Sequence, residues 1–352
     1  MTSRAWWAAA FFAAVCACSA PATDQQLRLG ESAERAGDAD AALDAYQRFI
    51  EQCAAADPAR MSSPRKQQCS SGYLARAELL ERTGQHTAAI EAYLGAPAAL
   101  PWDRASGSAG VYRAGRIYLE TGQAVKGYEL LWRTITHYPN QGFARDALKT
   151  VVRDGRKRNP AQLYQVLGDL IQPLAASELC DNLLYTMAEL AETELGDLEA
   201  ALAHYDKLTL DFEKSTMRDD ALWHGARLAR RLGDARGAVA RLKKLLATRE
   251  VAFLTGSYFS VWLDNGQLEL GLILRDDLRE YRAALRAFRT LPAHYPDSIL
   301  VDDAAWHSAL TYQAMNDSAR ACATLNRLRE KWPDSKYHLQ KAPALRKQLG
   351  CD

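Results

Sequence analysis

The stretch RAELLERTGQHTAAIEAYL, residues 76–94, consists of two helical patterns with Gly84 between them. Leucine, alanine, glutamate and arginine dominate the first pattern, and all four have high helix propensity. A glycine between two such patterns marks a turn, because glycine adopts backbone conformations that other residues disfavour. The stretch therefore predicts a unit of helix, turn and helix.

Equivalent stretches occur along the chain. A glycine separates two helical patterns at four further positions, namely Gly37, Gly122, Gly196 and Gly233. With Gly84 included, the successive glycines are 47, 38, 74 and 37 residues apart. A unit near 37 residues fits these steps, with one missed copy and one insertion of about ten residues. Self-similarity at this period indicates a repeat architecture.

Prolines recur at a fixed distance from the turn residues of the repeat. In two of the units a proline follows the turn glycine by 17 residues. Pro296 and Pro333 have no glycine at that distance, so counting back from them predicts turns at Arg279 and Asn316, which are again 37 residues apart. The repeat therefore continues toward the C-terminus without its turn glycine.

The sequences DDALWH, ending at His224, and DDAAWH, ending at His307, occupy one position of the repeat. Asp220 and Asp303 each come seven residues after the proline position. A carboxylate there lies in the first turn of a helix, where it accepts hydrogen bonds from free N–H groups and complements the helix dipole. Each histidine follows by four residues, the spacing of a modest pair on one helix face. We interpret both sequences as architecture, because a metal or acid–base site would need further convergent groups.

These spacings resemble the tetratricopeptide repeat, a helix pair with small residues at positions 8 and 20, glycine at 15, a large apolar residue at 24 and proline at 32. Position 8 is filled by Gly30, Ala77, Gly115, Ala226 and Ala309. Position 20 is filled by Ala42, Ala89, Gly127, Ala201, Ala238, Ala284 and Ala321. Position 24 is filled by Tyr46, Tyr93, Leu131, Tyr205, Leu242, Phe288 and Leu325. Two departures stand out: Glu189 replaces a small residue, and the unit 142–175 is recognisable mainly by Asp146.

The resemblance implies an all-α fold, a right-handed superhelical solenoid of about seven to eight helix pairs. It would cover residues 27–335, and residues 336–352 would form a capping helix and tail. A concave groove lined chiefly by first helices is the expected binding surface.

The first residues predict an export signal. An arginine precedes an apolar run from Ala5 to Val15, which is too short to span a bilayer as a helix and suits the hydrophobic region of a signal peptide. The sequence VCACS, which ends at Ser19, resembles a bacterial lipobox. The resemblance implies a signal peptide over residues 1–17, lipidation of Cys18, and residues 18–26 as anchor and linker. The alternative is cleavage near Ala20, which would release a soluble periplasmic or secreted protein.

An exported protein can form disulfides. Cys53 and Cys69 bracket a polar loop that contains proline, so a bond between them would hold that insertion. Cys322 lies on a predicted helix and Cys351 is next to the C-terminus, so a second bond would hold the tail. Cys180 is then a small buried residue. Metal binding by these cysteines is the weaker alternative, because no pair has zinc-site spacing.

Candidate partner-binding residues come from first-helix positions that face the groove in this family. They are Tyr112, Arg116, Trp223, Arg227, Arg230 and Arg231. Toward the N-terminus the corresponding positions are acidic, at Glu31, Glu34, Glu78 and Glu81, so the groove is expected to change from acidic to basic. The alternative interpretation is that these charges form ordinary solvated helix faces.

No enzyme motif occurs: the chain has no metalloprotease helix, no nucleophile elbow and no glycine loop for phosphate. No cofactor, metal, nucleic acid or small-molecule substrate is therefore expected. The repeats and the anchor resemble the BamD-type assembly lipoproteins of the outer membrane and the CpoB-type division coordinators. We expect a non-catalytic scaffold on the periplasmic face of the outer membrane that binds envelope proteins. The alternative is an accessory lipoprotein of polysaccharide or peptidoglycan processing that binds an anionic polymer.

Overall fold

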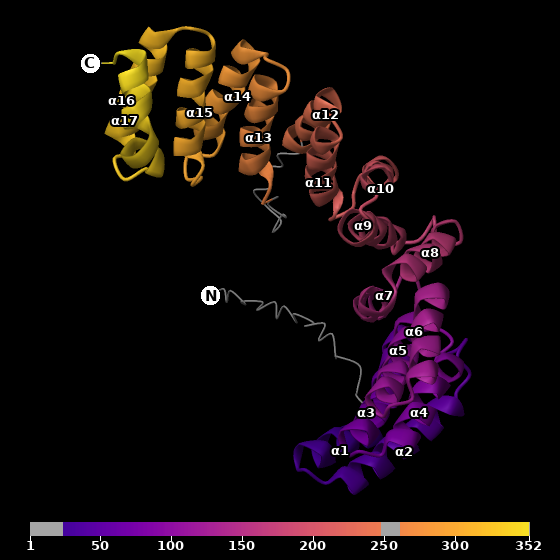
Figure 1. Cartoon of the computed structure of the whole chain (residues 1–352). Helices are drawn as coiled ribbons and strands as arrows, with labels where there is room; N and C mark the ends of the chain where they lie inside the picture. The colour runs from indigo at the N-terminus through magenta and orange to yellow at the C-terminus, as the bar shows by residue number, and fades with distance from the viewer. Residues whose placement is uncertain (1–23, 248–260, 352) are drawn as a thin grey trace, which may run out of the picture. The chain divides into compact units, whose positions relative to one another are not determined.

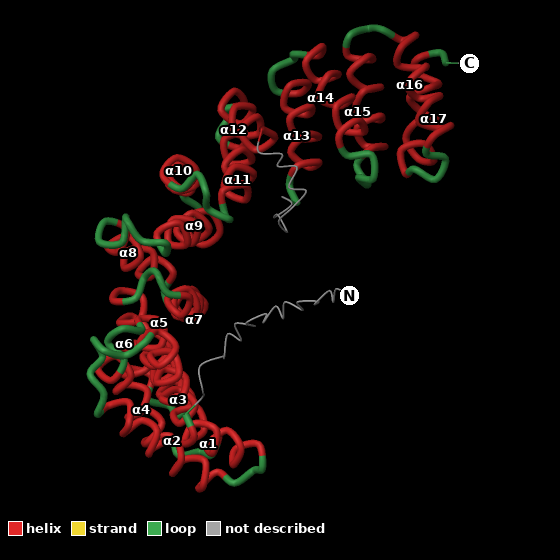
Figure 2. Tube along the Cα trace, turned by 180° about the vertical axis from the view of Figure 1, so that it is seen from behind, coloured by secondary structure: helices red, strands yellow, loops and turns green. Residues whose placement is uncertain are grey.

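The computed structural model describes residues 24–247 and 261–351. Every regular element among these residues is a helix, as the helix colouring in Figure 2 shows. The predicted signal peptide 1–17 and the lipidation site Cys18 lie outside the described residues. None of the described helices is both long and apolar enough to span a bilayer.

The described helices form consecutive antiparallel pairs with a short helix at the end (Figure 1). The pairs are α1 (Gln25–Arg35) with α2 (Ala39–Ala54), α3 (Ser63–Arg82) with α4 (His86–Ala99), α5 (Arg104–Glu120) with α6 (Ala124–His137), α7 (Gly142–Arg158) with α8 (Pro160–Ile171), α9 (Cys180–Leu190) with α10 (Leu198–Asp211), α11 (Arg218–Arg231) with α12 (Ala235–Ala247), α13 (Leu263–Asp276) with α14 (Tyr281–His294), and α15 (Val301–Ala314) with α16 (Ser318–Lys331). The final helix is α17 (Ala342–Leu349). The prediction of an all-α repeat fold is confirmed.

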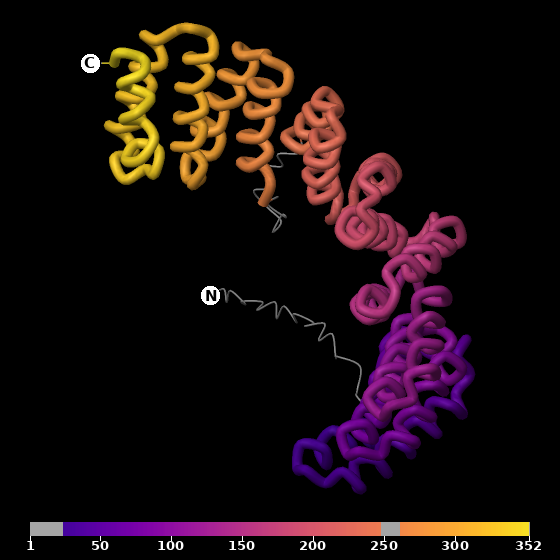
Figure 3. The backbone as a smooth tube through the Cα atoms, in the orientation of Figure 1, coloured from indigo at the N-terminus to yellow at the C-terminus, as the bar shows by residue number. Residues whose placement is uncertain are grey.

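The chain divides into two compact units, Met1–Ala147 and Leu148–Asp352, and the division falls inside α7. In the first unit, each helix from α1 to α6 packs against its neighbours in the chain. In the second unit the same holds from α8 to α17 (Figure 3). Further contacts join the first helices of successive pairs, α3 with α5 and α13 with α15. Packing of each repeat against the next repeat in the chain is typical of a solenoid. The right-handed superhelical sense stays a prediction from the resemblance.

The turn residues of the repeat have left-handed backbone conformations. All five turn glycines that the sequence analysis used have φ between 69° and 84°. Arg279 and Asn316, which were predicted as turns from the proline spacing, have φ of 54° and 57°, and they are the non-glycine residues of the described chain with positive φ. Because such a conformation is costly for a residue with a Cβ atom, its presence at both sites confirms the predicted register.

Small residues allow the two helices of each pair to approach closely. The alanines predicted at position 20 are fully buried, and the large residues at position 24 are at most 1% exposed. A Cβ atom added to Gly30 would lie 2.6 Å from the ring of Tyr46. In this unit position 8 is therefore small because the ring of Tyr46, at position 24, fills the space beside it.

The departure at Glu189 has a local cause. The π-helical segment Ala191–Leu195 extends α9 up to its turn glycine, and the Asp197 N–H donates to the Ala191 carbonyl, six residues back. In the other glycine-turn units the equivalent bond spans five residues. A π-turn inserts one residue, so the small residue expected at Glu189 moves back to Ala188, which is fully buried.

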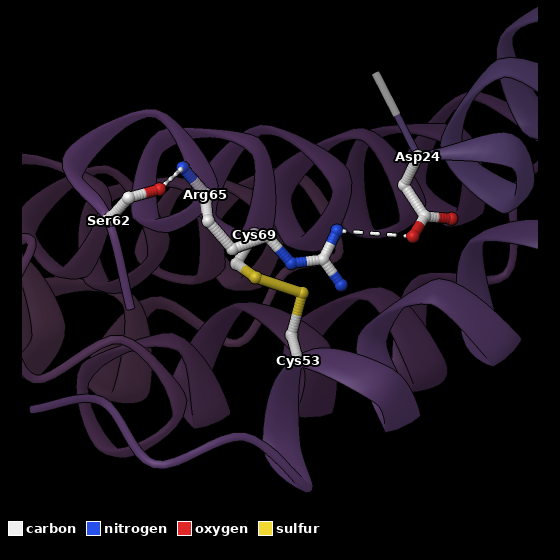
Figure 4. The surroundings of a disulfide bond; sticks show 5 residues. All are labelled: Asp24, Cys53, Ser62, Arg65 and Cys69. Carbon is white, nitrogen blue, oxygen red and sulfur yellow. Dashed lines mark hydrogen bonds and ion pairs between the residues drawn. A yellow bond between two sulfur atoms is a disulfide. The ribbon is translucent and has the colours of Figure 1, made fainter. Parts of the chain in front are cut away.

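Both predicted disulfides are present. Cys53 in α2 and Cys69 in α3 have Cα atoms 5.8 Å apart (Figure 4). The segment between them is not all loop as expected, because α3 already begins at Ser63 and the Ser62 side chain accepts a hydrogen bond from the backbone of Arg65. Cys322 and Cys351 form the second bond, and Cys180 is free and buried as predicted.

Candidate binding surfaces

The first copy of the repeated motif packs one helix pair against the next. Trp223 of α11 stacks on Trp262, with ring centroids 5.1 Å apart and planes inclined by 10°. The indole Nε1 of Trp262 donates a hydrogen bond to Asp220. Trp223 is only 8% exposed and belongs to the core around α11 to α14. This candidate groove residue is therefore part of the packing between repeats.

The second copy repeats this arrangement. Trp306 of α15 stacks on Tyr337, with centroids 5.4 Å apart and planes inclined by 13°. The Tyr337 hydroxyl donates to Asp303, and the Ser335 hydroxyl donates to Asp302 over 2.7 Å. Both aspartates lie in the first turn of α15, as predicted. Their carboxylates bind side chains of the segment that follows α16, so the motif is a contact between the last helix pair and the C-terminal segment.

The aspartate–serine bond is itself repeated in the second unit. Ser215 donates to Asp181 and Ser298 donates to Asp264, both over 2.6 Å. In each case the serine oxygen also accepts the N–H two residues later, at Met217 and Leu300. These two hydrogen bonds of the serine fix the residue at which the next first helix begins, which explains why aspartate recurs at this position.

The histidines of the two copies have partners other than the aspartates four residues before them. The ring of His224 stacks on Tyr205, with centroids 5.7 Å apart. His307 accepts a hydrogen bond from Arg275 at its Nδ1 atom over 2.8 Å and stacks on Phe288. The pairing of these histidines with the preceding aspartates stays a prediction, and side chains of neighbouring helices also position both rings. Burial lowers the pKa of His224 and of His307, so both rings favour the neutral form.

The three candidate arginines of α11 have different environments. Arg230 has ion-pair distances of 2.8 Å to Glu269 and 2.8 Å to Asp277, across to the next repeat. Arg231 has an ion pair of 2.9 Å with Glu192 in the preceding repeat. Both arginines therefore join neighbouring repeats. Arg227 is exposed, lies over the Trp223 ring at 5.9 Å, and has no carboxylate at ion-pair distance among the described residues.

This difference predicts separate outcomes for two charge reversals. Arg230→Glu is expected to lower the free energy of unfolding by about 2 kcal/mol, because it places a carboxylate among those that Arg230 neutralises. Arg227→Glu is expected to change it by no more than about 0.5 kcal/mol, because the side chain is exposed. Urea unfolding followed by circular dichroism measures both values. Equal losses in the two variants would contradict the assignment of Arg230 to inter-repeat packing.

The remaining candidates lie on α5 in the first unit. Tyr112 packs against Phe143, with centroids 5.3 Å apart, and is partly exposed. Arg116 is exposed and has an ion pair of 2.6 Å with Glu120 on its own helix. An i,i+4 pair of this kind contributes only about 0.3–0.5 kcal/mol, so Arg116 can exchange it for a partner at little cost. Of the six candidates, Arg116 and Arg227 are thus the cations most open to a partner.

The predicted acidic end is also involved in structural contacts. Glu34 accepts the hydroxyl of Tyr46 over 2.6 Å and pairs with Arg82 of the next repeat. Glu81 accepts the hydroxyl of Tyr93 over 2.6 Å in the same way. The carboxylate and burial together raise the pKa of both tyrosines. These glutamates therefore join helices and neighbouring repeats, and the expected change from acidic to basic is largely neutralised by such pairs.

The second unit also contains a pocket that the sequence analysis did not predict. A cavity of about 220 Å³ is bounded by α14, α15 and α16, and we call it the α14–α16 pocket. Leu285, Phe288 and Val301 contribute apolar surface, and Trp332 lies at the C-terminal end of α16. Because α14 and α16 are second helices of consecutive pairs, the pocket lies apart from the first-helix positions considered above.

Three cations line the α14–α16 pocket together with this apolar surface: Arg289, Arg327 and Lys331. All three are exposed, and no aspartate or glutamate lines the pocket. Among the described residues, none of the three has an ion-pair partner within 4.0 Å. The pocket therefore combines an apolar interior with an uncompensated positive rim.

Within residues 24–247 and 261–351, no three or more His, Cys, Asp or Glu side chains are grouped so that they could hold a metal ion. The fold and these surfaces define a helical repeat solenoid whose clustered polar residues mainly join its own repeats.

The comparisons name the repeat. Residues 26–54 and 303–335 match the family model described as tetratricopeptide repeat, and these segments are the first and the last helix pairs. These two helix pairs are thus similar to the tetratricopeptide repeat, and five of the six pairs between them have a turn residue in the left-handed conformation, whereas the link between α7 and α8 has none. No curated protein matches the sequence.

Solved structures with a similar arrangement share little sequence with this chain. A MamA structure from Desulfovibrio magneticus RS-1 is 15% identical over 54% of this chain and 97% of its own, with a TM-score of 0.39. The pilF protein of Pseudomonas aeruginosa is 14% identical over 67% and 97%, with a TM-score of 0.39. A tetratricopeptide repeat protein from Parabacteroides merdae is 21% identical over 69% and 92%, with a TM-score of 0.35.

Proposed function

We propose that this protein is a membrane-anchored, non-catalytic scaffold that binds other proteins of a bacterial cell envelope. The observation that carries the proposal is the repeat solenoid itself, whose stacked helix pairs expose long surfaces typical of protein-binding arrays. The anionic-polymer alternative is weakened at two of its arginines, because Arg230 and Arg231 already pair with carboxylates of neighbouring repeats.

The cysteines support a location in the envelope. Disulfides persist in oxidising compartments such as the periplasm and are rare in the cytosol. Four of the cysteines form two bonds that hold an insertion and the C-terminal tail. The lipobox-like sequence around Cys18 supplies the proposed anchor on the periplasmic face of the outer membrane.

The test is crosslinking in envelopes of the native host, followed by affinity purification of the full chain under denaturing conditions. The expected result is a small set of envelope proteins that are absent when an unrelated lipoprotein is purified in the same way. Recovery of only this chain, or of the same proteins with the unrelated lipoprotein, would contradict the scaffold function.

Lipidation is predicted at Cys18. Radiolabelled palmitate is expected to enter the wild-type protein and not the Cys18→Ala variant, which should accumulate as an unprocessed precursor. Autoradiography of the purified chains gives the answer, with Cys16→Ala as the matched control that keeps its label. Label in the Cys18→Ala variant, or a mature protein that begins after Ala20, would contradict the prediction.

A further inference from the structure

We infer that the α14–α16 pocket binds an acidic segment of a partner protein and takes up one large apolar side chain of that segment. The inference rests on the proposed scaffold function and names the chemistry of a partner for one surface of it. Three features of the pocket support it: the residues that line it, its size and its charge.

The lining of the pocket includes two positions that carry a salt bridge in another pair of second helices. Between α10 and α12, the guanidinium of Arg241 binds the carboxylate of Asp206 through two hydrogen bonds. Asp206 is the tenth residue after its turn residue, and Arg241 is the eighth after its own. The same two positions in the pairs α13–α14 and α15–α16 hold Arg289 and Thr324, which cannot form this bridge and which both line the pocket.

The size of the pocket suits a single side chain. Its volume of about 220 Å³ is below the roughly 300–1,000 Å³ of typical small-molecule sites. An apolar cavity of about 150 Å³ is already large enough to hold benzene. Phe288 and Leu285 provide a rigid apolar wall, because both are largely buried. A phenylalanine or leucine side chain is therefore the natural occupant.

The positive charge of the rim determines which residues of the partner can flank the inserted side chain. Arg289 is positioned by its own bond to the Leu285 carbonyl over 3.3 Å, and its guanidinium remains available. Arg327 and Lys331 are one turn apart on α16, on the opposite wall. Like charges so placed repel one another, and carboxylates on both sides of the inserted side chain would relieve this. The occupant is thus an apolar residue with acidic neighbours.

A double variant can close the pocket with a salt bridge that this chain already forms between two other helices. Arg289→Asp together with Thr324→Arg copies the Asp206–Arg241 bridge into the equivalent positions. We expect an unchanged melting temperature, because the same pair is already accommodated between α10 and α12. The probe is a blocked peptide with one phenylalanine between two pairs of glutamates. Binding to the full chain is followed through the indole N–H of Trp332 by NMR, with Trp332→Phe used for assignment.

The expected result is saturable peptide binding that shifts the Trp332 signal and is roughly tenfold weaker in the closed variant. Two matched peptides, one with alanine for phenylalanine and one with lysines for glutamates, should bind at least as weakly. Equal binding to wild type and closed variant, or equal binding of the lysine peptide, would overturn the inference. Self-association of the wild type that the closed variant loses would assign the pocket to a second copy and overturn it as well.

Different results would overturn the two proposals. Loss of peptide binding by the wild type, with envelope proteins still captured by crosslinking, would overturn the pocket and leave the scaffold function in place. Failure of the crosslinking experiment would overturn the scaffold function whatever the peptide does.

Discussion

Cys322→Ser combined with Cys351→Ser is expected to lower the free energy of unfolding of the C-terminal helices by about 3.5 kcal/mol, because the bond closes a loop with a sequence separation of 29 residues. The final helix α17 has eight residues, which is too short to be stable alone. Its Ala342 and Leu345 cover the apolar cluster that contains Trp306. Without the disulfide, we expect α17 to separate from this cluster and expose it.

Hydrogen exchange with mass spectrometry measures this effect segment by segment, which suits a loss that is confined to the C-terminal helices. Protection in α15 to α17 should fall, whereas protection in α1 to α4 should stay as in the wild type. Cys180→Ala is the matched control, because this cysteine is buried and unpaired. Unchanged protection in α17 in the double variant would contradict the assigned role of the bond.

The regular part of the fold was predictable because turn chemistry and helix contact leave a fixed spacing in the sequence. Arg279 shows how strong this spacing is, because arginine disfavours the left-handed conformation that it adopts there, whereas asparagine at position 316 tolerates it. The disulfides were predictable for a related reason: the cysteines lie at an insertion and at a tail that no regular repeat would hold.

Features that depend on contacts between repeats were harder to predict. The π-turn after α9 has no residue type that marks it, and only the misplaced Glu189 pointed to an inserted residue. Family positions assigned Trp223 and Arg230 to an open groove, yet Trp262 covers the first and Glu269 pairs with the second. Both partners lie about 40 residues away in sequence, so only the stacking of repeats brings them into contact.

The α14–α16 pocket left no specific signal in the sequence. Aligning the units on their turn residues places Arg289 opposite Thr324, where another pair of units has Asp206 opposite Arg241. The same two positions hold Lys243 and Ala287 in α12 and α14, so the lack of this bridge does not by itself locate a pocket. The pocket depends on how three helices pack together, which no spacing in the sequence records.

His307 is expected to make the protein less stable in mild acid. The ring lies between Phe288 and Tyr337, and its Nδ1 accepts a hydrogen bond from Arg275. Burial, and next the charge of Arg275, lower the pKa of His307 to about 4. Lys336 and Lys341 act in the same direction, and Asp276 opposes them. The folded protein therefore keeps this imidazole neutral at a pH where an unfolded chain would protonate it.

Above pH 6.5 the imidazole is neutral in both states, so it gives the stability no dependence on pH. Between pH 6.5 and 4 the unfolded chain binds a proton that the folded chain does not, so the free energy of unfolding falls by about 3 kcal/mol across this interval. Urea unfolding of the wild type and of His307→Gln at pH 7, 5.5 and 4 measures the effect, because carboxylates titrate alike in both proteins and cancel in the difference. The stability advantage of the wild type over the variant should shrink steadily with acidification. A difference that is the same at all three pH values would show that Arg275 does not hold the ring in its neutral form.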